Sequence, residues 1–200
     1  MIQVNYIKYK FTFNNNIKHS SYLYQKIFRS IYGYQQNVTK SNKKVYTYKR
    51  PGIISNTPHI KPGKNSIILP IGCEANLIEF FNTGKNPAHN WRNKGDWEVN
   101  YSINKIDVPK ESIIIELEEY IRDYKVINFE NKESTILIEI NKILNKEIND
   151  VNYMKNILKI SNNIILYDWF KDTYIYSDFL NKFHSDFLKL DEVVNIKWIC

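Results

Sequence analysis

The chain of 200 residues is long enough for one large domain or two small ones, and its 43% apolar content excludes wholesale disorder. Its two cysteines exclude a disulfide framework, and with neither a signal-peptide core nor a long apolar run the chain is expected in the cytoplasm or another reducing compartment, away from membranes. The net charge of +7 is unevenly distributed, because 12 lysines and arginines and no carboxylate precede Glu74, whereas residues 106–200 hold 12 basic and 17 acidic residues. The first half is therefore expected to face a polyanion.

Residues 1–108 are predicted to form a basic α+β domain. Ser20 or Ser21 can cap the first helix, and Gly33 stands where a helix ends in a left-handed residue. The elements expected in chain order are a strand at 2–13, a helix ending at 32, a polar loop at 37–44, strands at 45–50 and 67–71, a helix at 74–82, a loop at 83–96 and a strand at 97–108. This βαββαβ order predicts a ferredoxin-like domain, with a four-stranded antiparallel sheet and two helices on one face.

Residues 109–200 change in composition and are predicted to form an acidic, mainly helical module. Helices are expected at 111–125, at 133–146, from a cap at Asp150 to a break at Asn162 and Asn163, and at 177–190. A terminal strand is expected at 193–200. No flexible linker precedes this module. It is expected to pack on the basic domain or to contact a protein partner.

The stretch 45–71 carries the clearest functional signal. Because strand side chains alternate between faces, Tyr46, Tyr48 and Arg50 are expected on one face of the strand. A basic turn follows, and the apolar run 67–71 is expected to return as the second strand of a hairpin. Cations beside aromatic rings are what a nucleic-acid backbone and its bases require.

The candidate nucleic-acid-binding residues combine cations with rings that can stack on bases. They are Lys43, Lys44, Tyr46, Tyr48, Lys49, Arg50, His59, Lys61, Lys64, Trp91 and Arg92. Each has a plainer interpretation as well. Lys49 and Arg50 can be solvated charges of an edge strand, Tyr46 and Tyr48 can face inward, and Trp91 can pack back onto the sheet.

The leading interpretation is a non-catalytic nucleic-acid-binding protein that prefers RNA to DNA. The signature of the RNA-recognition motif is absent from the third expected strand, so that family is not assigned. No phosphate-binding glycine loop, no zinc spacing and no hydrolase motif occurs, so no metal or cofactor is predicted.

Two other functions remain open from the sequence. The first is a small metal-independent endoribonuclease that uses His59 with Tyr46, Tyr48 or a nearby lysine for proton transfer. The second is an architectural subunit of a nucleoprotein complex. A two-metal nuclease is disfavoured, because the carboxylates of the basic half are few and scattered.

Overall fold

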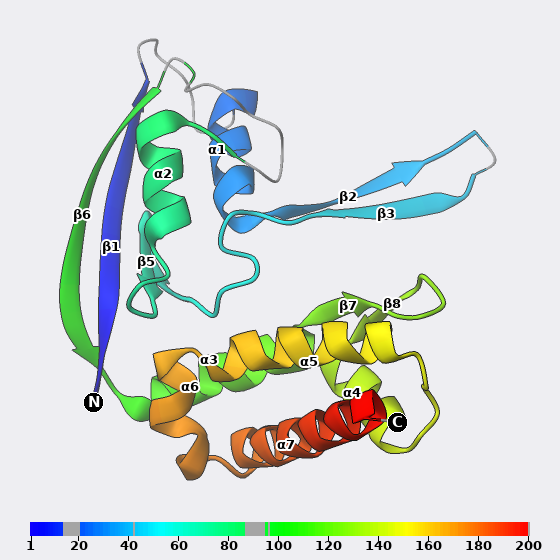
Figure 1. The fold of residues 1–200 in the computed structure, drawn as a ribbon. Coiled ribbons are helices and arrows are strands. Elements are labelled where there is room, and N and C mark those ends of the chain that lie inside the picture. Colours follow the sequence, from blue (N-terminus) through cyan, green and yellow to red (C-terminus); the bar gives the residue numbers. More distant parts are fainter. Residues whose placement is uncertain (14–20, 42, 87–94, 96, 200) are drawn as a thin grey trace. The chain divides into compact units, whose positions relative to one another are not determined.

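The chain folds into two compact units in the computed structural model (Figure 1). The described residues are 1–13, 21–41, 43–86, 95 and 97–199. Val4–Ile106 form one unit, called the basic unit here, and Met1–Gln3 with Asp107–Cys200 form the other, called the acidic unit. The names follow the charges of the two halves of the sequence.

The basic unit is built on a four-stranded antiparallel sheet in the order β4-β5-β1-β6. A second, two-stranded sheet contains β2 and β3 alone. The elements in chain order are β1 (Ile2–Phe13), α1 (Tyr22–Tyr32), β2 (Tyr34–Thr39), β3 (Val45–Arg50), β4 (Ile60–Gly63), β5 (Ser66–Leu69), α2 (Ala75–Thr83) and β6 (Trp97–Val108). The expected mixture of helices with a four-stranded antiparallel sheet is confirmed.

One face of this sheet is covered by both helices. Alternation along β1 turns Ile7, Tyr9 and Phe11 into the core and leaves Lys8 and Lys10 exposed. The remaining buried core residues come from α1, α2, β5, β6 and the segment before β4, and they are Ile27, Ile31, Ile54, Ile67, Leu69, Leu77, Phe80, Phe81 and Trp97. The rings pack edge-on or tilted, as aromatic quadrupoles favour.

Helix α1 begins and ends as the sequence predicts. The hydroxyl of Ser21 accepts a hydrogen bond from the Tyr24 backbone N–H at 3.3 Å, which satisfies one of the free donors of the first turn. Gly33 follows the last turn with φ of 76°, a conformation that favours glycine. Its N–H donates to the carbonyl of Arg29 at 2.8 Å.

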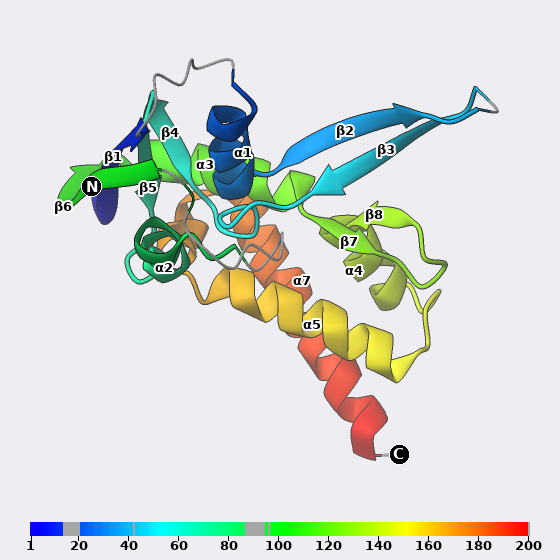
Figure 2. The ribbon, with the colours of Figure 1, turned by 90° about the horizontal axis from the view of Figure 1, so that it is seen from above.

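The prediction that residues 45–50 pair with 67–71 is wrong. This segment, β3, pairs with β2, so part of the expected polar loop 37–44 is strand, and β5 lies between β1 and the short β4. All six β3 side chains are exposed, so no apolar face holds it on the core. In Figure 2, β2 and β3 leave the end of α1 side by side as a twisted ribbon.

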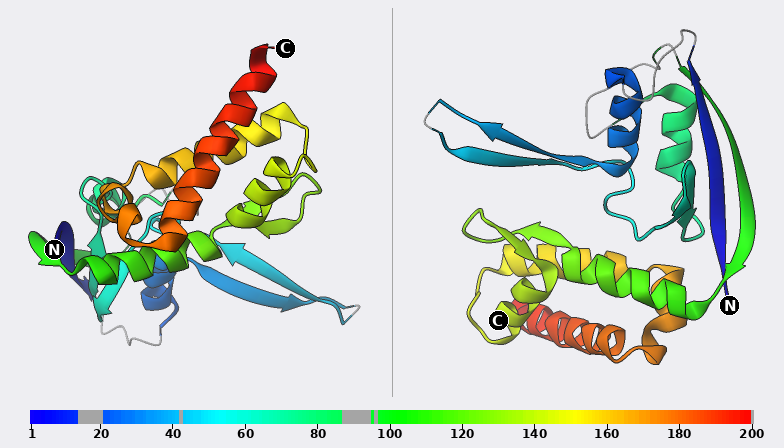
Figure 3. Two further views of the ribbon diagram at one scale, coloured as in Figure 1. Left: turned by 90° about the horizontal axis from the view of Figure 1, so that it is seen from below. Right: turned by 180° about the vertical axis from the view of Figure 1, so that it is seen from behind.

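The acidic unit is mainly helical, with one short hairpin. Its elements are α3 (Lys110–Asp123), β7 (Lys125–Ile127), β8 (Glu133–Thr135), α4 (Ile136–Leu144), α5 (Val151–Ile165), α6 (Asp168–Thr173), a 3₁₀ turn (Tyr174–Tyr176) and α7 (Asp178–Ile199). Helices α4, α5 and α7 pack against one another (Figure 3). The helix expected at 133–146 therefore begins three residues later, after β8, and the cap at Asp150 is confirmed by a 2.7 Å bond from the Tyr153 N–H.

Two predictions for this unit are wrong, the break in the third helix and the terminal strand. Helix α5 runs through Asn162 and Asn163 without a break, since Ile157, Ser161 and Ile164 keep a buried helical spacing across them. The chain end is helix rather than strand up to Ile199. The buried positions Phe183, Phe187, Leu190 and Val194 continue at helical intervals, so packing overrides the β-propensity of the valines.

A buried carboxylate ties three elements of the acidic unit together. Glu139 of α4 is fully buried and accepts hydrogen bonds from Lys142 at 3.2 Å and from the Tyr153 hydroxyl of α5 at 3.0 Å. Ser134 of β8 is a third partner. Burial alone would raise the pKa of Glu139, but the hydrogen bonds from Ser134, Lys142 and Tyr153 outweigh it and lower that pKa.

Replacing Glu139 with alanine is expected to destabilise the protein by about 2–3 kcal/mol at neutral pH, because buried partners lose their acceptor. The folded-state pKa is lowered, so this stabilisation is present above the unfolded pKa and is lost as pH falls through the folded one. In urea unfolding, Glu139→Ala should therefore have a lower free energy of unfolding than the wild type, and this difference should become smaller as the pH falls. The exposed Glu119→Ala is the control; an equal loss in both variants would refute the argument.

Candidate nucleic-acid interface

The ribbon of β2 and β3, with the turn that joins them, forms a protruding arm of residues 34–50 (Figure 1). Its register places Tyr34 opposite Arg50, Gln36 opposite Tyr48 and Val38 opposite Tyr46. Residues directly opposite each other share a face, so these six make one face, called the tyrosine face here. The other face carries Gln35, Asn37, Thr39, Val45, Thr47 and Lys49.

The arm is polar, cationic and exposed. Tyr46 and Tyr48 keep 37% and 40% of their surface accessible, and residues 34–50 contain five lysines and arginines and no carboxylate. The structure thus places both tyrosines outward, on the same face as Arg50. Such a surface can offer rings to bases and cations to phosphates.

Cations lie over tyrosine rings at both ends of the arm. Near the tip the Lys40 Nζ lies 4.5 Å from the centre of the Tyr46 ring. At the root the Arg29 guanidinium lies 5.0 Å from the centre of the Tyr34 ring. These contacts stabilise the orientations of the rings by about 0.5–1 kcal/mol each at exposed sites.

The root of the arm is fixed to the end of α1 by backbone contacts. Ile53 and Ile54 donate to the carbonyls of Ser30 and Ile31 at 2.9 and 3.1 Å, which satisfies two of the free acceptors at the helix end. Gly52 lies against Gly33 and Ile31 so closely that a Cβ there would overlap their backbone atoms. The buried Ile54 then joins the core, so the arm has a rigid base.

His59 lies at this root, beside Tyr32 rather than beside the tyrosines of the arm. The two rings are 6.2 Å apart, and the Lys61 Nζ lies 4.0 Å from the centre of the Tyr32 ring. The Tyr32 hydroxyl shares a 2.7 Å hydrogen bond with the buried Tyr9 hydroxyl. The cluster of Tyr9, Tyr32, His59 and Lys61 is called the root cluster below.

Burial favours the neutral form of the histidine in the root cluster. Its Nδ1 lies 2.9 Å from the Thr57 carbonyl, which can only accept, so Nδ1 carries the proton and Nε2 has the lone pair. Burial, together with the nearby Lys61 charge, lowers the pKa of His59 against the opposing effect of the Thr57 bond. Burial also raises the pKa of both Tyr9 and Tyr32.

The remaining predicted site residues fall into three groups. Lys43 and Lys44 lie at the tip, where the Lys43 N–H donates to the Lys40 carbonyl and Lys43 has φ of 61°. Lys64 is exposed in the turn between β4 and β5. Trp91 and Arg92 lie outside the described residues.

The structure adds four residues to the arm and the root cluster that the sequence did not indicate as site residues. Tyr34 and Lys40 belong to the arm, and Tyr9 and Tyr32 belong to the root cluster. A signal for Tyr34 was present, since residues 34–39 alternate with the same period of two as residues 45–50. The root cluster has no such local signal, because its members come from β1, α1, the residue before β4 and β4 itself.

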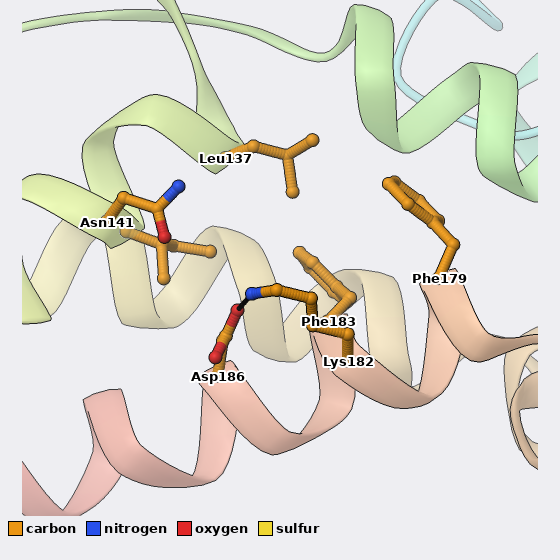
Figure 4. Close-up of a pocket in the computed structure, with 7 residues that line it drawn as sticks. Leu137, Asn141, Phe179, Lys182, Phe183 and Asp186 are labelled. Atoms are coloured by element: carbon orange, nitrogen blue, oxygen red, sulfur yellow. Dashed lines mark hydrogen bonds and ion pairs between the residues drawn. The ribbon is translucent and has the colours of Figure 1, made fainter.

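A small cavity lies in the acidic unit. It has a volume of about 130 Å³ and lies between α4 and α7, where the Lys182–Asp186 ion pair borders the rings of Phe179 and Phe183 (Figure 4). Ligand sites for small molecules and cofactors have roughly 300–1,000 Å³. The cavity is therefore too small for a nucleotide or an organic cofactor.

Among the residues described, no group of three or more metal-ligating side chains comes together. Over the same residues, no helix combines the length and the apolar character needed to cross a bilayer. Comparison of the chain with known protein families, with curated proteins and with solved structures finds no significant match.

Proposed function

We propose that this protein binds nucleic acid, RNA in preference to DNA, through the arm and the cations at its root. The observation that carries the proposal is the arm itself: a rigidly based ribbon with tyrosines and cations exposed and no carboxylate. Cations neutralise phosphates, and exposed rings stack on unpaired bases, which RNA offers in loops and ends. The binding residues proposed are the candidates named from the sequence, together with Tyr34 and Lys40.

A ferredoxin-like core for the basic unit is part of the proposal. With the arm set aside, the elements run β1-α1-β4-β5-α2-β6. The strand order β4-β5-β1-β6 puts the first and last strands side by side and the first strand between the last and the third. The arm is then an insertion between the first helix and the second strand of the sheet, which supports its role as a binding device on a common scaffold.

Binding of the full-length chain to mixed-sequence RNA at several salt concentrations tests the proposal. The affinity is expected to fall linearly with salt on a double-logarithmic plot, because each phosphate contact releases counterions. Deletion of the arm, with residues 34–50 replaced by a short glycine-serine turn, should remove most of that slope. A slope that the deletion leaves unchanged would refute the proposal.

A second candidate function, metal-independent cleavage of RNA, is favoured by one observation: burial lowers the pKa of His59, which lies beside Tyr32 near Lys61. Such a base can take the proton of a 2′-hydroxyl while a neighbouring cation stabilises the phosphorane. Binding remains the first choice, because Tyr46 and Tyr48 lie on the arm and Tyr32 is the aromatic neighbour of His59.

The full-length protein is expected to leave mixed RNA intact in EDTA, and His59→Ala is expected to change RNA affinity little. A catalytic base would contribute about 10²–10⁴-fold to cleavage. Gel analysis of end-labelled RNA distinguishes the two functions. Fragments ending in a 2′,3′-cyclic phosphate that disappear in His59→Ala, with binding intact, would establish the nuclease instead.

The proposed role of the acidic unit is to contact a protein partner or to act as a structural element within a nucleoprotein assembly. Its charge repels phosphates, and it exposes apolar side chains at Ile127 and Phe129. Replacing exposed carboxylates of this unit with alanine should therefore not weaken RNA binding. Such variants separate RNA contacts from protein contacts in any complex that is recovered.

A further inference from the structure

The two faces of the arm differ in chemistry, and the difference indicates which form of nucleic acid it takes. We infer that the tyrosine face is a stacking track for a single strand, with Tyr48 as its central platform. The inference rests on the proposed function and narrows its ligand to unpaired nucleotides. It follows from the register of the arm, the spacing of its rings and the positions of its cations.

The spacing of the rings suits an inserted base. Tyr46 and Tyr48 are two residues apart on one strand and share a face, so their attachment points are separated by about 6.6–6.8 Å. Successive stacked nucleotides of one strand are about 3.4 Å apart. One base can therefore lie between the two rings with contact on both of its sides.

The cations flank this aromatic step. On the side of the tip, the Lys40 Nζ lies over the Tyr46 ring. On the side of the root, Arg50 follows Tyr48 on the same face. Across the ribbon, Tyr48 faces the uncharged Gln36. A strand laid along the face thus meets a cation, two rings and a cation in turn, which matches phosphates on either side of a stacked base.

A duplex does not fit this arrangement. Its bases are stacked on each other and paired, and the major groove of an A-form helix is deep and narrow, so rings on a ribbon cannot reach a base face. The opposite face of the arm carries Lys49 and no aromatic ring. It can hold a phosphate, but it has no means of stacking.

The test exchanges two neighbouring residues of β3. Tyr48→Thr removes the ring, and the double variant Thr47→Tyr with Tyr48→Thr moves it to the opposite face without changing composition or charge, because side chains alternate. The full-length proteins are titrated with an oligoadenylate of about a dozen nucleotides, with its deoxy counterpart, and with the oligoadenylate–oligouridylate duplex. An oligoadenylate containing 2-aminopurine reports stacking through its fluorescence.

Both variants are expected to bind the single strand roughly 5- to 150-fold more weakly than the wild type, the range that base–aromatic stacking supplies. Duplex affinity, salt slope and unfolding midpoint should stay unchanged, and the quenching of 2-aminopurine should disappear. Val45→Ala removes an apolar side chain, 62% exposed, from the other face and should bind as the wild type does. Equal binding of ribo- and deoxy-strands would show that the track accepts both sugars.

Wild-type binding by the exchanged variant, or an equal loss for single strand and duplex, would overturn the stacking track and leave the proposed function in place. The proposed function makes a separate requirement: variants of the arm with reversed charge must lose the salt-dependent binding. If charge reversal has no effect, the proposed function fails and the track fails with it. The two failures are thus distinguishable.

Discussion

Reversing Lys49 and Arg50 to glutamate is expected to lower the RNA affinity of the full-length protein on the order of 100-fold. The two cations lie at the root end of the arm on opposite faces, and Arg50 pairs across the ribbon with Tyr34. A hydrogen bond to a charged group contributes about 1.5–3 kcal/mol, so two lost contacts correspond to roughly two powers of ten or more. Equilibrium titration at fixed salt measures the change.

The loss should be similar for different RNA sequences, because phosphate contacts position a ligand without reading its bases. The logarithmic salt slope should fall by about 1.4, the value for two single-strand phosphate contacts. The matched control reverses the exposed Lys125 and Lys159 of the acidic unit, which changes the net charge by the same amount. A comparable loss in the control would mean that overall charge, rather than the arm, determines binding.

Replacing Gly52 with alanine is expected to destabilise the protein by about 3 kcal/mol or more. A Cβ at this position would overlap the backbone nitrogen of Gly33 and the carbonyl of Ile31, and backbone atoms cannot move aside as a flexible side chain can. Relief of the overlap would break the bonds from Ile53 and Ile54 to the end of α1. Urea denaturation followed by circular dichroism measures the effect.

Gly63→Ala is the control for this prediction. Its added Cβ would meet only the Ser66 hydroxyl at 3.6 Å, an ordinary contact, so stability should change by less than about 1 kcal/mol. If Gly52→Ala also unfolds with the wild-type midpoint, the close approach of the two glycines does not fix the arm. RNA binding by the folded fraction of Gly52→Ala would then show whether the arm keeps its position.

Strand pairing is where the sequence and the structure diverge most. The alternation in residues 45–50 identifies a strand and the face that Tyr46, Tyr48 and Arg50 share, and both features are present. It does not identify the partner strand, because an alternating exposed segment pairs equally well with any available edge. Residues 34–39 supply that edge, since the chain reverses after Thr39 and brings residues 45–50 back alongside them.

In the acidic unit, too, some features follow from local sequence and others depend on packing. Local signals predict the cap at Asp150 and the helical face of residues 111–125, because capping and helical periodicity act within a few residues. The predicted terminal strand is wrong, because the buried Val194 continues the packed face of α7. Propensity is a weak determinant wherever burial is available.

The sequence by itself determined the charge contrast between the two halves and the common face of the arm's tyrosines, because the first depends on composition alone and the second on the alternation of side chains along one strand. Only the tertiary structure decided that His59 meets Tyr32 and Lys61 instead of Tyr46 and Tyr48. It also decided that β3 leaves the sheet and forms an arm with β2. The physical reason is that contacts between segments distant in the chain depend on which edges and surfaces the whole fold leaves available, and no local pattern records them.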